Sequence, residues 1–219
     1  MKKLLAAATA GLALTAAGAH ADTTVAAVIG TTGLGLQVSA PFSEKWAVRL
    51  GANGMARSYD TTSNQVRYDL DLKIRSVDLL LDFHPMMNPF RVSAGVTYNG
   101  NTLTGVARPA GASYVFNGRS YPTASIGRVD ADVEFRAGAP YLGIGWGTSA
   151  RMSGSWSFVS DLGVQFTGQP TARVVSRDCT GPLCPTLAAD LAVERAKLQD
   201  ELDKLKAYPV VRVGVSYTF

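Results

Sequence analysis

Charged side chains recur at every second position in several stretches of this sequence, which is the spacing that puts them on one face of a β-strand. Paired carboxylates could act as a general acid and base, whereas carboxylates facing arginines could line a passage for a charged solute. We favour the second interpretation, because carboxylates attract the ammonium and guanidinium groups of small cations. The candidate lumen and solute-contacting residues are Asp69, Asp71, Asp78, Asp82, Asp130, Asp132, Glu134, Asp161, Arg49, Arg57, Arg91, Arg136 and Arg212.

Catalysis would need a nucleophile or a base that the rest of the sequence does not offer. His84 is the one histidine after residue 21, and it lies beside Pro85 in a predicted turn. Cys179 and Cys184 are the two cysteines of the chain, and two cysteines without suitably spaced histidines do not make a zinc site. We therefore predict that the protein is not an enzyme and uses no metal or cofactor.

The charged stretches belong to eight segments that alternate as β-strands do and are separated by turn-forming residues. These segments are 23–29, 33–40, 46–59, 66–83, 90–106, 128–146, 156–175 and 208–219. Their connections alternate between short and longer ones, which is typical of outer-membrane barrels. The short connections and both termini would lie in the periplasm, and the long connections outside the cell.

One face of these segments is apolar. In 90–99, for example, Phe90, Val92 and Val96 alternate with polar or small residues. Only 186–206 has the pattern of a helix that could cover such faces, so lipid must cover them, and backbone groups in lipid must all be paired. The sequence thus predicts an all-β fold: an eight-stranded antiparallel transmembrane β-barrel over residues 22–219, in the bacterial outer membrane. A secreted β-sandwich is the alternative.

Two segments break this alternation. In 66–83 the earlier carboxylates share one side of the strand and the later ones lie on the other, so we predict a bulge near 75–77 that turns all of them into the lumen. In 128–146 the charged residues and the apolar residues have the same parity, which predicts a switch of faces around Gly138-Ala139.

Residues 1–21 have the pattern of a secretory signal peptide. Lys2 and Lys3 precede an apolar run, and Ala19-His20-Ala21 provides the small-x-small pattern of a cleavage site. Without this segment the chain carries 19 basic and 17 acidic residues, a net charge of +2. Export and this weak charge argue against nucleic acid as a partner.

The connection 176–207 differs from the others because it contains a predicted helix. Leucines recur at helical spacing through 186–206, and Pro185 suits its start. We place this helix in the last extracellular loop, next to a disulfide between Cys179 and Cys184 that an oxidising compartment favours. The helix is either a cap or gate folded over the barrel mouth or an amphipathic element packed on the extended strands or on the surface of the outer leaflet.

The segment 208–219, YPVVRVGVSYTF, has valines on the side that would face lipid. Tyr217 would lie at the membrane interface, and a final Phe219 resembles the C-terminal signal of outer-membrane barrels. This pattern predicts two partners, the outer-membrane lipid and the barrel insertion machinery that reads the last strand.

Several stretches resemble the CarO-type ornithine-uptake porins. They are GTTGLG at 30–35, APYLGIGWG at 139–147, FTGQPTARV at 166–174, the helical insert and the final strand. The likeness extends over most of the mature chain. It implies an eight-stranded barrel associated with the slow uptake of basic amino acids.

Together, the residues and the resemblance predict an outer-membrane barrel that gives low-conductance passage to small cationic solutes such as basic amino acids. The alternative is a closed barrel with a structural or surface-interaction role and no transport. A lateral channel for a hydrophobic ligand is disfavoured by the mixed charges expected in the lumen.

Overall fold

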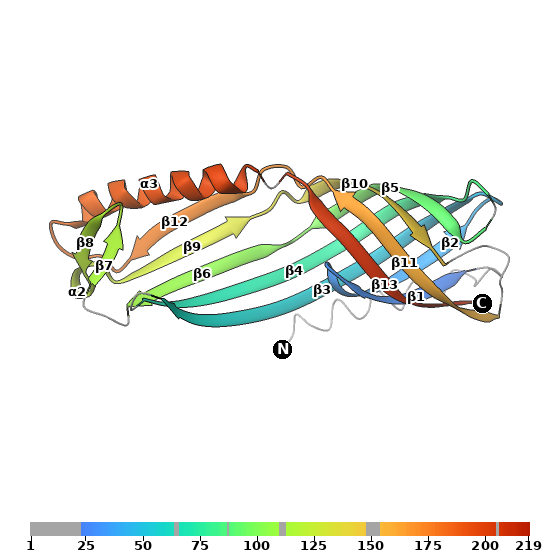
Figure 1. Cartoon of the computed structure of the whole chain (residues 1–219), viewed down its shortest axis with the longest axis horizontal. Coiled ribbons are helices and arrows are strands. Elements are labelled where there is room, and N and C mark those ends of the chain that lie inside the picture. Colours follow the sequence, from blue (N-terminus) through green and yellow to red (C-terminus); the bar gives the residue numbers. More distant parts are fainter. Residues whose placement is uncertain (1–22, 64–65, 87, 110–112, 148–153, 205) are drawn as a thin grey trace.

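Eight antiparallel strands close into a barrel (Figure 1). The computed structural model describes residues 23–63, 66–86, 88–109, 113–147, 154–204 and 206–219. The barrel strands are, in the order of their pairing, β1 (Thr24–Gly30), β2 (Gly33–Pro41), β3 (Trp46–Ser63), β4 (Val66–Phe83), β5 (Phe90–Asn99), β10 (Gly138–Trp146), β11 (Ser155–Gln165) and β13 (Tyr208–Thr218). β13 pairs with β1 and closes the ring, so the predicted eight-stranded barrel is confirmed.

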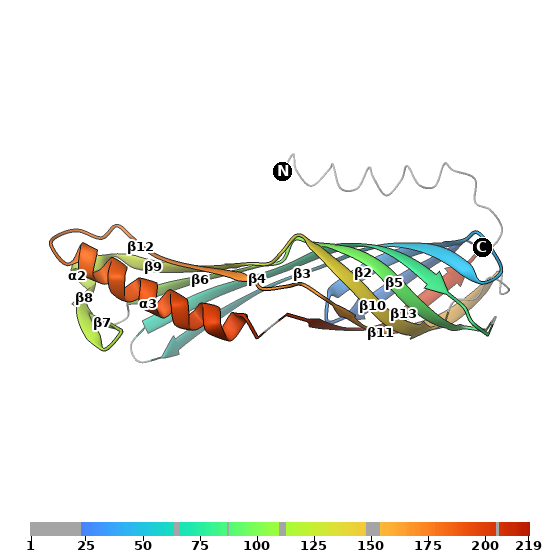
Figure 2. The same ribbon diagram turned by 90° about the horizontal axis from the view of Figure 1, so that it is seen from above.

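A second region, which we call the lobe, extends from one end of the barrel (Figures 1 and 2). Its sheet consists of the far halves of β3 and β4 followed by β6 (Thr102–Pro109), β9 (Arg128–Glu134) and β12 (Thr171–Arg177). The lobe also contains the hairpin of β7 (Ser113–Phe116) and β8 (Arg119–Pro122), the short helix α2 (Thr123–Ile126) and the helix α3 (Cys184–Leu202).

Three of the predicted strands are divided where the barrel meets the lobe. The segment 90–106 becomes β5 and β6, 128–146 becomes β9 and β10, and 156–175 becomes β11 and β12. Each division marks a change of partners, since β10 pairs with β5 and β11, whereas β9 pairs with β6 and β12. β3 and β4 run through both regions as strands of 18 residues each.

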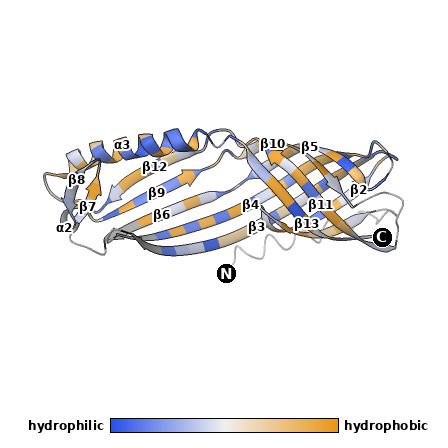
Figure 3. Cartoon of the chain, in the orientation of Figure 1, coloured by the Kyte–Doolittle hydropathy of each residue, from blue (hydrophilic) through white to orange (hydrophobic). Residues whose placement is uncertain are grey.

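The barrel is apolar outside and polar inside, the reverse of a soluble protein. On β4 the outward side chains of Val77 and Leu79 are 52% and 50% exposed, while Ser76 and Asp78 are buried inside. Figure 3 shows hydrophilic and hydrophobic residues alternating along the strands. An apolar outer wall of this kind is suited to contact with lipid tails.

Aromatic residues surround the end of the barrel at which residues 42–45 and 84–89 connect strands, which we call the short-turn end. Trp46 packs on Phe83 with ring centroids 4.6 Å apart, and Trp156 packs on Tyr217 at 5.3 Å. Phe90 and Trp146 are 6.4 Å apart. Such amphipathic rings favour the membrane–water interface, so this girdle marks one edge of the membrane-spanning band.

The predicted bulge near 75–77 is wrong, because β4 pairs with β3 in one register over all 18 residues of each strand. The predicted switch of faces around Gly138-Ala139 is wrong as well. Even-numbered residues are on the outer face in both β9 and β10, although the strand is interrupted between them. The outer face stays the same along these strands, but its surroundings change. It would face lipid in the barrel and water in the lobe, so the same parity carries apolar residues in one region and charged residues in the other.

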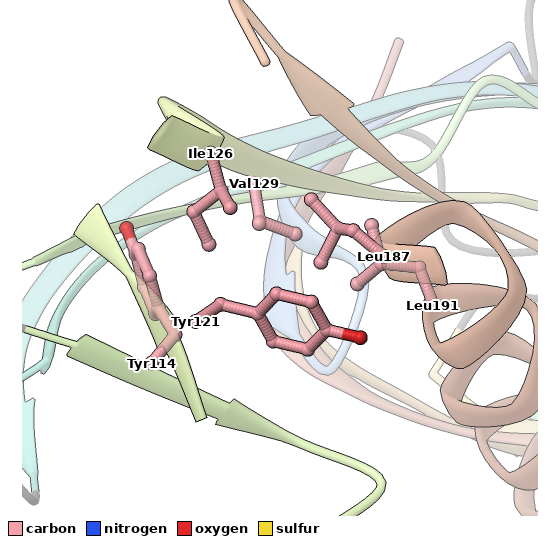
Figure 4. Packing of buried hydrophobic residues seen from close by; sticks show 6 residues of the cluster. All are labelled: Tyr114, Tyr121, Ile126, Val129, Leu187 and Leu191. Atoms are coloured by element: carbon pink, nitrogen blue, oxygen red, sulfur yellow. The ribbon is translucent and has the colours of Figure 1, made fainter. Parts of the chain in front are cut away.

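A small core joins the hairpin and α3 within the lobe (Figure 4). Its buried members are Tyr114, Tyr121, Ile126, Val129, Leu187 and Leu191. A disulfide links Cys179 to Cys184 at the start of α3, with 6.0 Å between the Cα atoms. Among the described residues, no helix has the length and apolar character needed to cross a membrane. The signal peptide predicted at 1–21 lies outside the described residues.

Candidate functional site: the charged interior of the barrel

The structure brings six of the predicted charged residues together inside the barrel. They are Arg49 on β3, Asp78 and Asp82 on β4, Arg91 on β5, Asp161 on β11 and Arg212 on β13. The alternation of each strand turns them inward, and none of them is more than 3% exposed. Three arginines and three aspartates cancel, so this interior group carries no net charge.

Arg49 is the centre of the interior network. Its Nε lies 2.8 Å from Asp82 Oδ2, and its Nη1 donates to Asp161 Oδ2 at 2.9 Å. Gln37 Oε1 and Ser93 Oγ accept two further hydrogen bonds, each of 3.0 Å. A guanidinium has its donors in a fixed planar fork, so Arg49 holds carboxylates from the neighbouring strand β4 and from the distant strand β11 at the same time.

Arg91 completes this group from the neighbouring wall. Its Nη2 donates to Asp161 Oδ1 at 2.6 Å, and its Nε lies 3.8 Å from Asp82 Oδ2. Room for these side chains depends on Gly145, where a Cβ atom would lie 2.7 Å from Asp161 Oδ1 and 2.9 Å from Arg91 Cζ. Glycine at this position therefore lets the ion pair occupy the interior.

A second ion pair is formed by Asp78 and Arg212, with Oδ2 2.8 Å from Nη2. Asp78 also accepts hydrogen bonds from Thr97 Oγ1 at 2.8 Å and from Asn53 Nδ2 at 2.9 Å. Arg212 Nε donates to Thr32 Oγ1 at 2.9 Å. This carboxylate thus has one charged and two neutral donors.

Apolar side chains fill another part of the same interior. Leu80, Tyr141 and Val210 pack together, and each is at most 3% exposed. A charge in a low-dielectric site is tolerated only when it is paired, and here the arginines and aspartates pair with one another. These apolar and ion-paired side chains fill the parts of the interior that they occupy.

The neutral partners in this network were not among the predicted site residues. Ser93 is two residues from Arg91, and Asn53 is four residues from Arg49, so both share the inward parity of a charged residue on their strand. That parity was the available signal. Parity shows that a side chain points into the barrel, but it does not show which other side chain it contacts there.

The remaining predicted residues lie outside the barrel, so their predicted placement in the lumen is wrong. Asp69 and Asp71 on β4, and Asp130, Asp132 and Glu134 on β9, lie on the outer face of the lobe sheet; Arg57 is on its inner face, and Arg136 is exposed between β9 and β10. The lobe projects beyond the apolar band, so water and neighbouring arginines stabilise these charges. Asp130, for example, pairs with Arg128 at 3.3 Å and with Arg177.

A separate polar cluster fastens the hairpin to α3, and the sequence did not predict it. Asp190 accepts hydrogen bonds from the Tyr121 hydroxyl and from Asn117 Nδ2 (3.1 Å), and Arg119 Nε lies 3.8 Å away. The bond from Tyr121 holds the pKa of Asp190 below its ordinary value of 3.8. The same bond raises the pKa of Tyr121.

The structure places His84 at the short-turn end, where its backbone N–H donates to the Lys45 carbonyl at 2.8 Å. Within the described part of the chain, no three histidine, cysteine or acidic side chains are grouped as metal ligands. That the protein is not an enzyme stays a prediction from the sequence.

Comparison with known proteins identifies the fold. No family model and no curated protein matches the chain. Two solved structures from Acinetobacter baumannii match it: CarO2 with 21% sequence identity and a TM-score of 0.58, and CarO with 25% and 0.57, each over 90% of this chain and 98% of the other. The fold is that of a CarO-type small outer-membrane barrel. A major outer membrane protein from Thermus thermophilus also matches, with 18% identity and a TM-score of 0.48, over 91% of this chain and 100% of that chain.

A CarO-type barrel is a protein of the bacterial outer membrane, and the predicted location is confirmed. The apolar outer wall and the aromatic girdle of this chain are the physical counterparts of that location, because lipid tails contact the first and the interface contacts the second. The resemblance seen in the sequence is confirmed at the level of the fold.

Proposed function

We propose that this protein gives small polar solutes slow passage across the outer membrane through its barrel, and that the described conformation is the closed state of that passage. The charged interior is the observation that carries this proposal. A barrel that served only as an anchor could be filled with apolar side chains, since replacing a buried ion pair by apolar residues is often neutral or stabilising. Ion pairs and neutral donors inside the barrel would instead provide polar contacts for a solute.

Passage requires the interior ion pairs to part. Breaking one buried pair costs roughly 3–5 kcal/mol, which would populate a state with that pair open on the order of 10⁻² to 10⁻⁴ of the time, and a passage that needs several pairs to part would open less often still. A passage that opens so rarely would have a low conductance. Solute groups that replace the broken bonds would reduce this cost.

The balanced interior points to the class of solute. Three arginines and three aspartates favour neither sign of charge, whereas most of the acidic residues predicted to contact cations lie on the lobe. A zwitterion could bond an arginine through its carboxylate and an aspartate through its ammonium. We therefore propose amino acids, the basic ones among them, as the solutes.

The same proposal includes an orientation, with the short-turn end in the periplasm and the lobe outside the cell. Short periplasmic turns and long external segments are the rule in outer-membrane barrels. β13 would be the strand read by the insertion machinery. Its pairing with β1 closes the ring, and Tyr217 packs on Phe219 with ring centroids 5.0 Å apart.

Flux of ornithine, serine, glutamate and a neutral sugar into liposomes containing the refolded mature protein tests this function. Arg91→Gln removes one guanidinium from the network and should raise amino-acid flux severalfold. The double variant D78L/R212M replaces an ion pair by apolar side chains and should lower it. D71N/D132N changes two carboxylates on the outer face of the lobe and should leave flux unchanged.

The second candidate function is a closed barrel that anchors and displays the lobe. Its supporting observation is that all six interior charges are paired and nearly inaccessible. If folded and inserted protein shows no flux above empty liposomes, and Arg91→Gln shows none either, passage is rejected and this second function is favoured.

A further inference from the structure

We propose that the outer wall of this protein binds the phosphate-bearing headgroup of a membrane glycolipid, of the lipopolysaccharide kind, at the boundary between barrel and lobe. The site contains four basic residues, Lys73, Arg75, Arg136 and Arg173, which we call the basic belt. The proposal rests on the orientation given above, which places this boundary at the outer leaflet, and it does not depend on transport through the barrel.

The backbone brings two of the belt residues, Arg75 and Arg136, to one level. Gly100 N–H donates to the Arg75 carbonyl at 2.8 Å, and Asn99 N–H donates to the Ala137 carbonyl at 2.6 Å. Arg75 and Arg136 therefore flank the division at which β5 gives way to β6 and β9 to β10. This division is visible near the middle of the molecule in Figure 1.

The next row of the outer face continues across the lobe sheet. Lys73 pairs with Thr102, Thr102 with Glu134, and Glu134 with Thr171. Strands lie about 4.8 Å apart, so this row is about 14 Å long. Arg173 is on the same face, two residues beyond Thr171. The belt thus covers an area comparable to a disaccharide with its phosphates.

The apolar outer wall ends directly below the belt. On β4 the outward series passes from Leu79 and Val77 to Arg75 and Lys73 at consecutive outward positions. On the neighbouring strand β5, Tyr98 is 65% exposed and pairs with Val77. The cationic side chains therefore begin where lipid tails would end and headgroups would begin.

The belt side chains make no ion pair or hydrogen bond with any described residue, and all four are exposed. The interior arginines are all paired with aspartates, and on the lobe Arg128 and Arg177 share Asp130. Carboxylates lie close to the belt on the same face, notably Glu134 and Asp132, yet they leave these cations unpaired. Four donors are thus available to an external anion.

A hollow of about 380 Å³ lies beside one belt residue, Arg136. It is lined by Glu134, Phe135, Arg136, Gln169 and Thr171. A guanidinium binds phosphate through two parallel hydrogen bonds, and the amide and the hydroxyl could bond sugar hydroxyl groups. Glu134 would repel a phosphate, so its removal should favour binding.

Native mass spectrometry can count lipid bound to the refolded mature protein in detergent micelles. The probes are lipopolysaccharide, the same glycolipid after removal of its phosphates, and phosphatidylglycerol, with inorganic phosphate as a competitor. Arg75→Ser with Arg136→Ser should weaken lipopolysaccharide binding about tenfold or more, the loss expected for charge-assisted hydrogen bonds. Lys45→Ser with Arg195→Ser removes two exposed positive charges elsewhere and serves as the matched control.

The proposal is supported if the belt variant alone loses affinity, if the dephosphorylated glycolipid and phosphatidylglycerol bind more weakly, and if Glu134→Gln binds at least as tightly as the wild type. It is overturned if the belt variant binds like its control, if removal of the phosphates changes nothing, or if Glu134→Gln weakens binding. Displacement by millimolar inorganic phosphate would assign the site to a free anion and would also reject it. Gel mobility before and after heating verifies that each variant is a folded barrel, and the flux assay tests the transport proposal separately.

Discussion

The strand β4 passes through the barrel and the lobe without changing faces, and the two regions use these faces in opposite ways. In the barrel its inner face carries Asp78 while its outer face carries Val77. In the lobe its inner face carries Ile74 while its outer face carries Asp71. In the barrel the charged face of β4 is the inner one, which points away from lipid. In the lobe the charged face is the outer one, which points toward water.

The two regions also stabilise their charges differently. Inside the barrel each guanidinium is paired with a carboxylate, because a desolvated charge is tolerated only when it is paired. At the boundary with the lobe, Arg75 and Arg136 are exposed and unpaired among the described residues. The same substitution should therefore have very different effects in the two places.

The largest effect is expected for Arg49→Met, which removes the guanidinium shared by Asp82 and Asp161. Loss of one partner leaves buried charge uncompensated and should lower the free energy of unfolding by roughly 3–5 kcal/mol. Arg136→Met at the boundary should change it by less than about 0.5 kcal/mol. Urea unfolding of both variants in lipid vesicles measures this difference, and equal effects would contradict the contrast between the two regions.

Gly145→Ala tests how tightly the interior network is packed. The added methyl group would meet Asp161 Oδ1 and Arg91 Cζ, and overpacking of this kind costs roughly 1–3 kcal/mol. Gly138→Ala is the matched control, because a Cβ atom there would meet nothing within 4 Å. A Gly145→Ala barrel as stable in urea as the Gly138→Ala barrel would show that the network has room to move.

Removal of the disulfide tests whether the lobe is an independent unit of stability. Cys179→Ser with Cys184→Ser opens a short loop and should cost at most about 2 kcal/mol, confined to α3. Hydrogen exchange should become faster in α3, while the amides of β10 and β11 keep their protection. Faster exchange in the barrel strands would show instead that the two regions unfold together.

The smallest effect is expected at Asp190, where the hairpin meets α3. Its pKa is depressed, so the ionised form contributes stability above pH 3.8 that is lost as the pH falls through the lower pKa of the folded state. Asp190→Asn should speed hydrogen exchange in β7 and β8 severalfold at neutral pH. Acidification should change this exchange less in the variant than in the wild type. Asp200→Asn, on an exposed part of α3, should leave this exchange and its pH dependence unchanged.

The sequence placed charged residues in the interior correctly where their part of the strand lies within the barrel. Arg91 and Asp161 lie on strand segments that stay within the barrel, and their parity placed them correctly in its interior. Asp71 and Asp132 lie on segments that extend into the lobe, where the same kind of pattern led us to predict a bulge and a switch of faces that the structure does not contain. Odd or even position along a strand shows which face of the sheet a side chain is on. It does not show whether that part of the strand lies in the lipid-facing barrel or beyond it.

The amino-acid sequence by itself determined that the chain forms eight alternating strands with one face for lipid, because side-chain alternation is local and lipid requires every backbone group to be paired. Only the tertiary structure decided which charges meet. Arg49 and Asp161 are 112 residues apart, and their contact depends on the closure of the ring and on the space at Gly145. The lobe too was decided by pairing, since β6 pairs with the far half of β4, β9 pairs with β6, and β12 pairs with β9. Such partners are chosen by long-range geometry, which no local pattern encodes.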